Sequence, residues 1–510
     1  MIERLKKNFI NISALKFAII IAFLNLVFFH APLFKFCLEN LDMAKFGSKL
    51  MIACMVLIIP IANALVIYIL CRISRVLAKV LCVFFFIVNA ISMYFMKTFN
   101  IMLNETMIGN VLNTNVDEAT GFFSPGLLIY TVLLGLLPAI YIIIAKPAKP
   151  QKPLPIIGIM ILSVTILTGM NYKSVPWIHL HSDALGAYVM PWSYIVNIGR
   201  YYKHRHDNNI EPIRLPDASI KDSTKAVVVL VIGESARSEN FSLYGYGRNT
   251  NPLLAKVPGL RHFNAKSAHT YTIAGVRSIL SHEPTKKPHE CLPNYLYRTG
   301  AEVIWRTTNT GEPKLTIEKF KDAGTLKAEY PEADSDYDEI LIQGLCQEIV
   351  SSGKDKTLLV LHTSTSHGPD YFRKYPDWAE TFKPVCKSVE LEKCPKEQLF
   401  NAYDNTIVYT DYLLNGIIEQ LKELKGYRVS MIYISDHGES LGEKSVYMHA
   451  MDRKFAPKEQ FDIPFIVWLS DDSLKLKDSP MLSQQHIFHS VLRFLSIDSP
   501  VYNKELDIFE

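Results

Sequence analysis

Two patterns of apolar positions divide the chain. In the first third, long apolar stretches follow one another. Each is close in length to the segment of about 20 residues that a helix needs to cross a bilayer. Beyond residue 220 the apolar runs shorten to strand length and alternate with longer segments. No small-residue cleavage site follows the first stretch, so we expect a retained anchor. The predicted spans are 17–36, 50–71, 80–96, 126–145 and 154–171.

The basic residues beside these spans predict the orientation of the membrane domain. Lys and Arg cluster before the first span, between the second and third, and between the fourth and fifth, whereas the opposite loops hold fewer. Because cytoplasmic loops carry the excess of basic residues, we expect a cytoplasmic amino terminus. Five crossings then place everything after Tyr172 in the periplasm of a bacterium. The residues used are Arg4, Lys6, Lys7, Lys16, Arg72, Arg75, Lys79, Lys146, Lys149 and Lys152.

The segments after the spans predict a connector and then an α/β domain. The connector holds Trp and Tyr side chains suited to a membrane interface and a polar linker around Asp207-Asn208-Asn209. The predicted domains are therefore 1–172, 173–220 and 221–510.

Within the last domain, predicted strands alternate with predicted helices. Such alternation favours a mostly parallel sheet covered on both faces. The strands are 226–232, 301–305, 357–362, 428–434 and 464–469, and the helices are 272–281, 339–351, 399–423 and 484–496.

Composition narrows the classes of function. Hydrophobic residues make up 49% of the chain and charged residues 20%, with a formal net charge of +4. The basic residues form no stripe, which argues against nucleic-acid binding. Four of the eight cysteines lie in the polar remainder of the chain, where export would permit disulfides. Cys386 and Cys394 bracket a short loop and are the favoured pair, with Cys291 and Cys346 as the other available pair.

Two predicted strand ends carry the strongest candidates for chemistry. One strand ends just before Glu234, and another just before Asp436 and His437. Ligands of open α/β sheets bind beyond the carboxyl ends of the strands, so these groups can converge on a metal such as zinc. The alternative is a pair of ordinary strand-to-helix turns with the carboxylates as helix caps. His367 and His449, which also lie soon after predicted strand ends, favour the metal site.

Hydroxyl groups precede the predicted helix 272–281. Thr270 and Thr272 lie where a helix N-terminus favours an alkoxide and binds phosphate, and a nearby metal would ease loss of the hydroxyl proton. The alternative is a simple N-cap threonine, and Thr270 can serve in both roles.

A further polar pattern lies between the third and fourth spans. Asn110, Thr114 and Glu118 recur at i, i+4 and i+8, which on one helix would form a single polar stripe. A solvated helix face is the more common explanation. The location of the stripe on the same side of the membrane as the last domain keeps a functional role open.

These residues together resemble the bacterial phosphoethanolamine transferase family, the membrane-anchored members of the alkaline-phosphatase and sulfatase superfamily. The resemblance covers the spans, the connector and the last domain. Its most specific motifs are Ile232-Gly233-Glu234-Ser235-Ala236-Arg237, Asn240-Phe241-Ser242-Leu243-Tyr244-Gly245-Tyr246, Ser366-His367-Gly368-Pro369, Ser435-Asp436-His437-Gly438-Glu439-Ser440 and Tyr447-Met448-His449.

The resemblance implies a metal centre and a nucleophile. Glu234, Asp436 and His437 would hold one firmly bound zinc ion, with Thr270 as its fourth ligand and as the nucleophile. The segment around Thr270 departs from the family pattern. Relatives read Ser-Cys-Gly-Thr and then Pro-Cys, whereas this chain has Ser267-Ala268-His269-Thr270 and no cysteine in the following helix.

The resemblance also implies substrate contacts. His367 and His449 would bind the phosphoryl group, a second metal or the leaving group. Asn110, Thr114 and Glu118 would meet the ethanolamine headgroup of the donor.

The fold implied is a five-helix transmembrane domain followed by a periplasmic alkaline-phosphatase-like α/β/α domain. The implied function is zinc-dependent transfer of phosphoethanolamine from phosphatidylethanolamine, through a phosphothreonine-type intermediate, to lipid A or another envelope glycan. We expect a monomer in the bacterial inner membrane. The alternatives are a glycerol-phosphate transferase or a phosphodiesterase on the same fold, and a membrane scaffold with an inactive domain, against which the intact candidate set argues.

Overall fold

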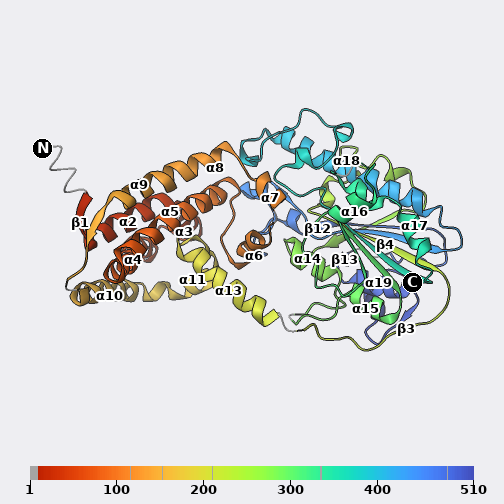
Figure 1. Ribbon diagram of the computed structural model, residues 1–510, viewed down its shortest axis with the longest axis horizontal. Helices are drawn as coiled ribbons and strands as arrows, with labels where there is room; N and C mark the ends of the chain where they lie inside the picture. Colours follow the sequence, from red (N-terminus) through yellow and green to blue (C-terminus); the bar gives the residue numbers. More distant parts are fainter. Residues whose placement is uncertain are drawn as a thin grey trace. The chain divides into compact units, whose positions relative to one another are not determined.

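The apolar stretches of the first third fold into long helices (Figure 1). The computed structural model describes residues 10–114, 116–151, 153–208, 211–285, 287–333, 336–478 and 481–510. Within these, four helical stretches are long and apolar enough to cross a membrane. They are α4 (Phe46–Ile73), α5 (Arg75–Thr98), the run Pro125–Ile144 formed by α8 (Pro125–Tyr130), η1 (Thr131–Leu136) and α9 (Leu137–Ile144), and α10 (Pro153–Met170).

The first predicted span is bent. α2 (Ala14–Phe29) and α3 (Ala31–Asn40) meet at an angle of 57°. His30 separates the two helices, and Pro32 stands in the first turn of α3. A proline lacks a backbone N–H, which costs nothing in a first turn, whereas the same residue within one continuous helix would remove a hydrogen bond. The described chain thus has four candidate spans, or five if the bent pair is one span. Of the residues that predict orientation, Arg4, Lys6, Lys7 and Lys152 lie outside the described residues.

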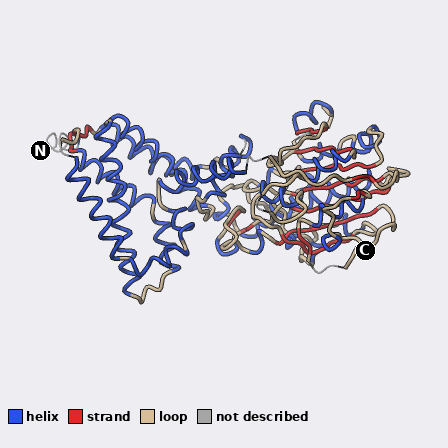
Figure 2. Tube along the Cα trace, turned by 90° about the horizontal axis from the view of Figure 1, so that it is seen from below, coloured by secondary structure: helices blue, strands red, loops and turns tan. Residues whose placement is uncertain are grey.

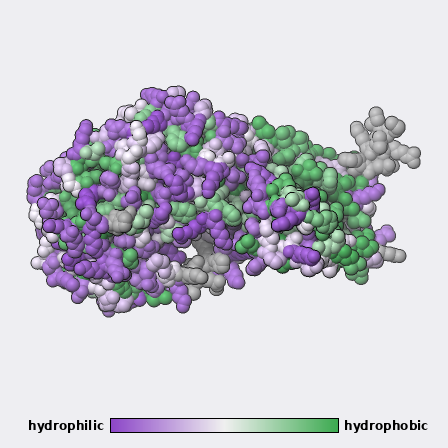
Figure 3. Space-filling view, turned by 180° about the vertical axis from the view of Figure 1, so that it is seen from behind, coloured by the Kyte–Doolittle hydropathy of each residue, from purple (hydrophilic) through white to green (hydrophobic). Residues whose placement is uncertain are grey.

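The chain divides into two compact units. Unit 1 comprises the residues up to Thr114 together with Phe123–His204, and unit 2 comprises Asn115–Phe122 and Arg205–Glu510. Many large apolar side chains of unit 1 are exposed, among them Phe23, Leu128 and Ile143, and Figure 3 shows apolar residues (green) gathered over these helices. Such a surface suits contact with lipid.

The predicted connector does not form a separate region. Its helices α11 (Val175–Leu180), α12 (Ser182–Tyr188) and α13 (Trp192–Asn208) belong largely to unit 1, where Tyr194 packs in the core. Leu215 instead joins the core of unit 2. The division between the units therefore falls at residues 204 and 205, before the predicted domain start at 221. Asn209 of the predicted linker lies outside the described residues.

The proposed polar stripe is not on one helix, so that expectation is wrong. α6 (Glu105–Asn113) ends at Thr114, whose ψ of 129° is extended, and a separate helix, α7 (Val116–Gly121), follows. The Thr114 hydroxyl donates to the Asn110 carbonyl at 2.9 Å, which caps the end of α6. The side chain of Glu118 lies outside the described residues.

Unit 2 is built around an eight-stranded sheet, whose strands run side by side in Figure 2. The strands from β9 to β7 are all parallel, while β12 is antiparallel to both of its neighbours. The strand order is β13 (Leu482–Ser483), β5 (Arg261–Lys266), β12 (Asp462–Leu469), β9 (Arg428–Ser435), β4 (Ala226–Gly233), β8 (Lys356–His362), β6 (Glu302–Thr307) and β7 (Lys319–Asp322).

Helices accompany this sheet as the alternation predicts. Predicted helix 339–351 is divided by Gly344, whose φ of +58° no regular helix adopts, into the 3-10 turn η6 (Asp338–Ile342) and α17. The helices of unit 2 beyond α7 are α14 (Thr272–Ile279), α15 (Leu292–Thr299), α16 (Ala323–Glu329), α17 (Leu345–Ser351), α18 (Lys396–Leu421) and α19 (His486–Phe494).

The favoured disulfide is confirmed. Cys386 and Cys394 are bonded, with their Cα atoms 5.9 Å apart. The other available pair does not form, because Cys291 and Cys346 are both free thiols. Cys346 instead donates to the Gln420 carbonyl.

Candidate active site

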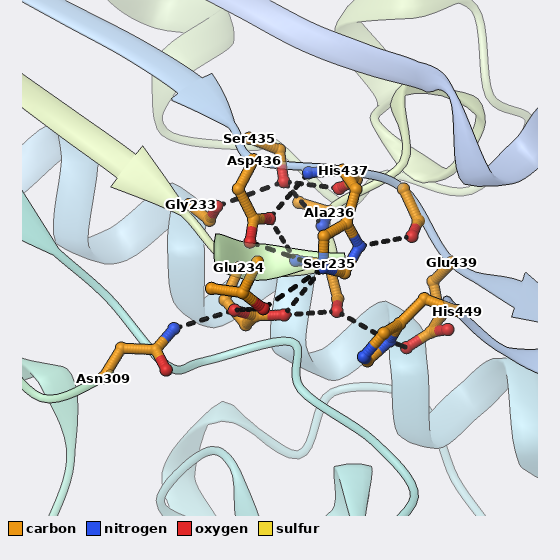
Figure 4. A network of polar contacts seen from close by, with 12 residues as sticks. Gly233, Glu234, Ser235, Ala236, Asn309, Ser435, Asp436, His437, Glu439 and His449 are labelled. Carbon is orange, nitrogen blue, oxygen red and sulfur yellow. Dashed lines mark hydrogen bonds and ion pairs between the residues drawn. The ribbon is translucent and has the colours of Figure 1, made fainter. Parts of the chain in front are cut away.

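The register of β4 and β9 brings the two predicted strand ends together. Gly233 lies opposite Ser435 in this parallel pair, so Glu234 and Asp436 leave the sheet at the same edge. Both side chains are buried. The Ser235 amide donates to Asp436 Oδ1 at 3.1 Å. Figure 4 shows the resulting cluster at the strand ends.

His437 faces both carboxylates. Its Nε2 lies 3.5 Å from Glu234 Oε1 and 3.4 Å from Asp436 Oδ2. Its Nδ1 lies 2.9 Å from the Gly438 carbonyl, which can only accept a hydrogen bond. Nδ1 therefore carries the proton, and in the neutral ring the lone pair of Nε2 points to the carboxylates. An imidazole held in this way by a backbone carbonyl is the usual arrangement of a metal-binding histidine.

The cluster concentrates negative charge in a buried place. Burial opposes ionisation of Glu234, but the imidazoles of His437, His367 and His449 hold its pKa below its usual range. Burial and the adjacent Glu234 charge raise the pKa of Asp436 well above its usual range. Asp436 Oδ2 accepts no hydrogen bond from the described residues. Two buried carboxylates with an unused oxygen fit a bound cation, which would let both ionise.

Three ligand atoms already lie close enough to share an ion. One atom each from Glu234, His437 and His449 lie within 4.8 Å of one another. His449 Nδ1 lies 3.3 Å from the Ser235 hydroxyl and 3.2 Å from Glu439 Oε2. The ring centroids of His367 and His449 are 5.3 Å apart. The structure thus gathers all the histidines predicted for the site.

The two threonines separate in the structure. The Thr272 hydroxyl lies 3.2 Å from Glu234 Oε2 and 3.4 Å from His437 Nε2. The Thr270 hydroxyl instead donates to the Met451 carbonyl at 2.7 Å, away from the carboxylates. Extended Tyr271 lies between them, and Thr272 is the first residue of α14. The predicted roles of Thr270 therefore fit Thr272 better.

Helix α14 approaches the cluster closely because of Gly275. A Cβ built on Gly275 would lie 2.4 Å from the Asp436 carbonyl oxygen, so only glycine allows this contact. The contact brings the first turn of α14, with its free N–H groups, beside the carboxylate edge of the sheet. Such a helix end attracts phosphate.

One positioning residue was missed by the sequence reasoning. The Asn309 amide donates to Glu234 Oε2 at 2.8 Å and to the Thr363 carbonyl at 2.9 Å. Asn309 follows the end of β6, at the same edge of the sheet. A search for polar residues after every predicted strand, amides included, would have found it.

The fold and the site define a membrane-anchored sulfatase-type enzyme. A family profile described as Sulfatase matches residues 226–497, and one described as Phosphoethanolamine transferase EptA/EptB matches residues 61–206. The chain is 38% identical over 501 residues to the phosphoethanolamine transferase EptA of Helicobacter pylori. The matched region covers 95% of this chain and 94% of the relative.

Solved structures agree with this assignment. The integral membrane lipooligosaccharide phosphoethanolamine transferase A from Neisseria meningitidis is 26% identical, with a TM-score of 0.87 over 98% of this chain and 99% of that one. The C-terminal periplasmic domain of phosphoethanolamine transferase EptC from Campylobacter jejuni is 35% identical, with a TM-score of 0.52, over 58% of this chain and 97% of that one.

The chain belongs to the phosphoethanolamine transferase EptA family. It is a phosphoethanolamine transferase, and this favours the transferase expectation over the alternatives on the same fold. It is a multi-pass integral membrane protein with a periplasmic C-terminal catalytic domain.

Proposed function

We propose that this chain moves phosphoethanolamine from phosphatidylethanolamine to lipid A or another envelope glycan, with Thr272 as the nucleophile. The observation that carries the proposal is the position of the Thr272 hydroxyl, 3.2 Å from Glu234 Oε2 and 3.4 Å from His437 Nε2. The acceptor is supported by the Neisseria relative, which is a lipooligosaccharide phosphoethanolamine transferase. The chain would act as a monomer.

Zinc suits the donor set. Glu234, Asp436, His437 and Thr272 would hold one ion, since carboxylate and imidazole are common zinc ligands. When bound, the ion would lower the pKa of the hydroxyl and offset charge on phosphoryl oxygens. A second ion held by His367 and His449 stays a prediction.

The chain's own residues account for the rest of the reaction. The Thr272 hydroxyl gives its proton to Glu234 Oε2, 3.2 Å away, as its oxygen attacks the donor phosphorus. The bond from phosphorus to the diacylglycerol oxygen breaks. A protonated imidazole at His367 or His449 gives its proton to the leaving oxygen. The acceptor oxygen then attacks the phosphothreonine and its proton returns to the imidazole. Thr272 is released as its oxygen takes back the proton held by Glu234. Two displacements on one residue predict ping-pong kinetics.

Donor binding by the predicted polar residues remains a proposal. Asn110, Thr114 and Glu118 would contact the ethanolamine headgroup. They do not form one stripe, because Asn110 lies on α6, Thr114 follows its end and Glu118 lies on α7. Glu118, as the anionic member, would pair with the ammonium group.

Intact-mass spectrometry of the full-length protein tests the nucleophile. After incubation with phosphatidylethanolamine, the wild type and Thr270→Ala should carry an added phosphoethanolamine, and Thr272→Ala should carry none and transfer none. Thr270→Ala should cost only about 1–3 kcal/mol of stability, because the Met451 carbonyl loses its buried donor. An adduct on Thr272→Ala, or its loss only in Thr270→Ala, would restore Thr270 as the nucleophile.

A further inference from the structure

A second cluster of metal-binding groups lies in unit 2, beyond the end of α14. One ligand atom each from His282, Glu283 and His289 lie within 4.8 Å of one another. The cluster shares no residue with the active site. Figure 1 shows α14, α15 and α19, the helices around this part of the chain, together on one side of the sheet.

His282 is held in place by its surroundings. Its carbonyl accepts a hydrogen bond from His489 Nε2 of α19 at 2.7 Å. Its ring lies 5.8 Å from that of Phe488 and 4.9 Å from that of His289, centroid to centroid. A side chain fixed by packing and backbone contacts loses little freedom on binding a ligand.

His289 is fixed through its backbone to the segment that leads into unit 2. Ile213 and His289 form a β-bridge. The Ile213 amide donates to the Pro288 carbonyl at 2.8 Å, and the Glu290 amide donates to the Ile213 carbonyl at 3.0 Å. The backbone of His282 is therefore held by α19, and that of His289 by the segment at Ile213.

Two ring nitrogens of this cluster make no hydrogen bond to the described residues. The Nδ1 atoms of His282 and His289 are buried and have no hydrogen-bond partner among the described residues. Glu283 Oε1 lies 3.5 Å from His282 Nε2, and Glu283 itself is exposed. Buried polar groups without a partner are costly, so their persistence points to a ligand.

We propose that His282, Glu283 and His289 bind a divalent cation of the zinc type, separate from the active-site ion. Two imidazoles and a carboxylate leave one tetrahedral position for water. The ion would tie the chain directly after α14 to the segment at Ile213. Because α14 carries Thr272 at its other end, the ion would restrain the helix that presents the nucleophile.

Metal titration of the full-length protein tests this site without reference to activity. Chelator-treated protein in detergent would be titrated with Zn²⁺ against a chromophoric competitor. The wild type should bind one more equivalent than His289→Gln. Glu283→Gln is a change at an exposed position that does not threaten folding. This variant should bind the additional equivalent at least about tenfold more weakly, because losing even a residue that only hydrogen-bonds to a metal ligand lowers metal affinity by about this factor.

The matched control is His262→Gln, which removes an exposed histidine of β5 outside both clusters. It should keep the wild-type stoichiometry and affinity. Equal zinc binding by the wild type, His289→Gln and Glu283→Gln would overturn the proposal. The zinc titration does not depend on the adduct experiment on Thr272. Failure of the proposed second metal site can therefore be distinguished from failure of the proposed nucleophile.

Discussion

Both units bury polar side chains, but of different kinds. In unit 1 the Asn63 amide donates to Asn25 Oδ1 at 3.1 Å, and Trp192 Nε1 donates to Asn63 Oδ1 at 2.8 Å. Among the described residues of that unit, the buried polar side chains include no carboxylate, lysine or arginine. In unit 2 the buried groups at the strand ends are carboxylates and imidazoles, such as Glu234 and His437.

The difference separates polar groups that hold a fold from polar groups that await a ligand. The neutral amides of Asn25 and Asn63 bond to each other, and in a lipid environment this is far less costly than burying an ion. Glu234 and Asp436 instead repel each other, and Asp436 keeps an oxygen without a donor among the described residues. The bonded amides of Asn25 and Asn63 therefore indicate architecture, whereas two adjacent buried carboxylates indicate a site.

The largest expected effect breaks the unbalanced cluster. Asp436→Asn should abolish transfer, by about 10³-fold or more given the several kcal/mol that a metal supplies, and should lower bound zinc. In the metal-free state, however, the variant should be more stable than the wild type by about 1–3 kcal/mol, because a buried repulsion is removed. Denaturant unfolding with and without chelator measures both.

Asp478→Asn is the matched control, since Asp478 is 94% exposed. It should change neither zinc content nor metal-free stability. A metal-free Asp436→Asn protein less stable than wild type would show that the cluster is balanced without an ion.

A smaller effect is expected from a buried carboxylate outside the site. Asp411 of α18 accepts from the amides of Leu253 and Leu254 at 2.8 and 3.0 Å, and burial raises its pKa from 3.8 to about 6. A pKa that is higher in the folded state contributes stability in full below the unfolded value, and this contribution is lost as pH rises through about 6.

The loss amounts to about 3 kcal/mol at most. Asp411→Asn should remove it, so the stability difference between variant and wild type should change between pH 4 and pH 7. Urea unfolding across this range measures the change. A constant difference would mean that Asp411 ionises as it does in water.

The smallest effect sharpens the comparison from the side of unit 1. Asn63→Leu leaves the side-chain oxygen Oδ1 of Asn25 and the indole N–H of Trp192 without their partner. The change should lower the free energy of unfolding by about 0.6–2 kcal/mol. Zinc content and the Thr272 adduct should be unchanged. Adding Asn25→Leu should recover part of the cost, because one stranded group is removed. Loss of zinc in Asn63→Leu would join this amide network to the active site.

The sequence predicts some features of the molecule better than others, for physical reasons. Continuous apolar runs such as β4 are evident because both faces of that strand are buried. β5 was not predicted, since its burial alternates and its residues are mostly polar. The choice between Thr270 and Thr272 depends on where α14 begins and on how Gly275 meets Asp436, neither of which local pattern reveals. The cluster at His282 and His289 likewise depends on contacts with α19 and Ile213.

The register of β4 and β9 also has a consequence for how the protein matures. The Ser235 amide and Asp436 are 201 positions apart in the chain, and Thr272 and His437 are 165 apart. Contacts of such separation form late and slowly, and until β9 arrives one edge of the apolar strand β4 stays open to wrong partners. The metal ligands do not exist as a set before that step. A newly exported chain therefore has no active-site metal to gain until its central sheet is complete, and zinc uptake at this site marks the end of folding.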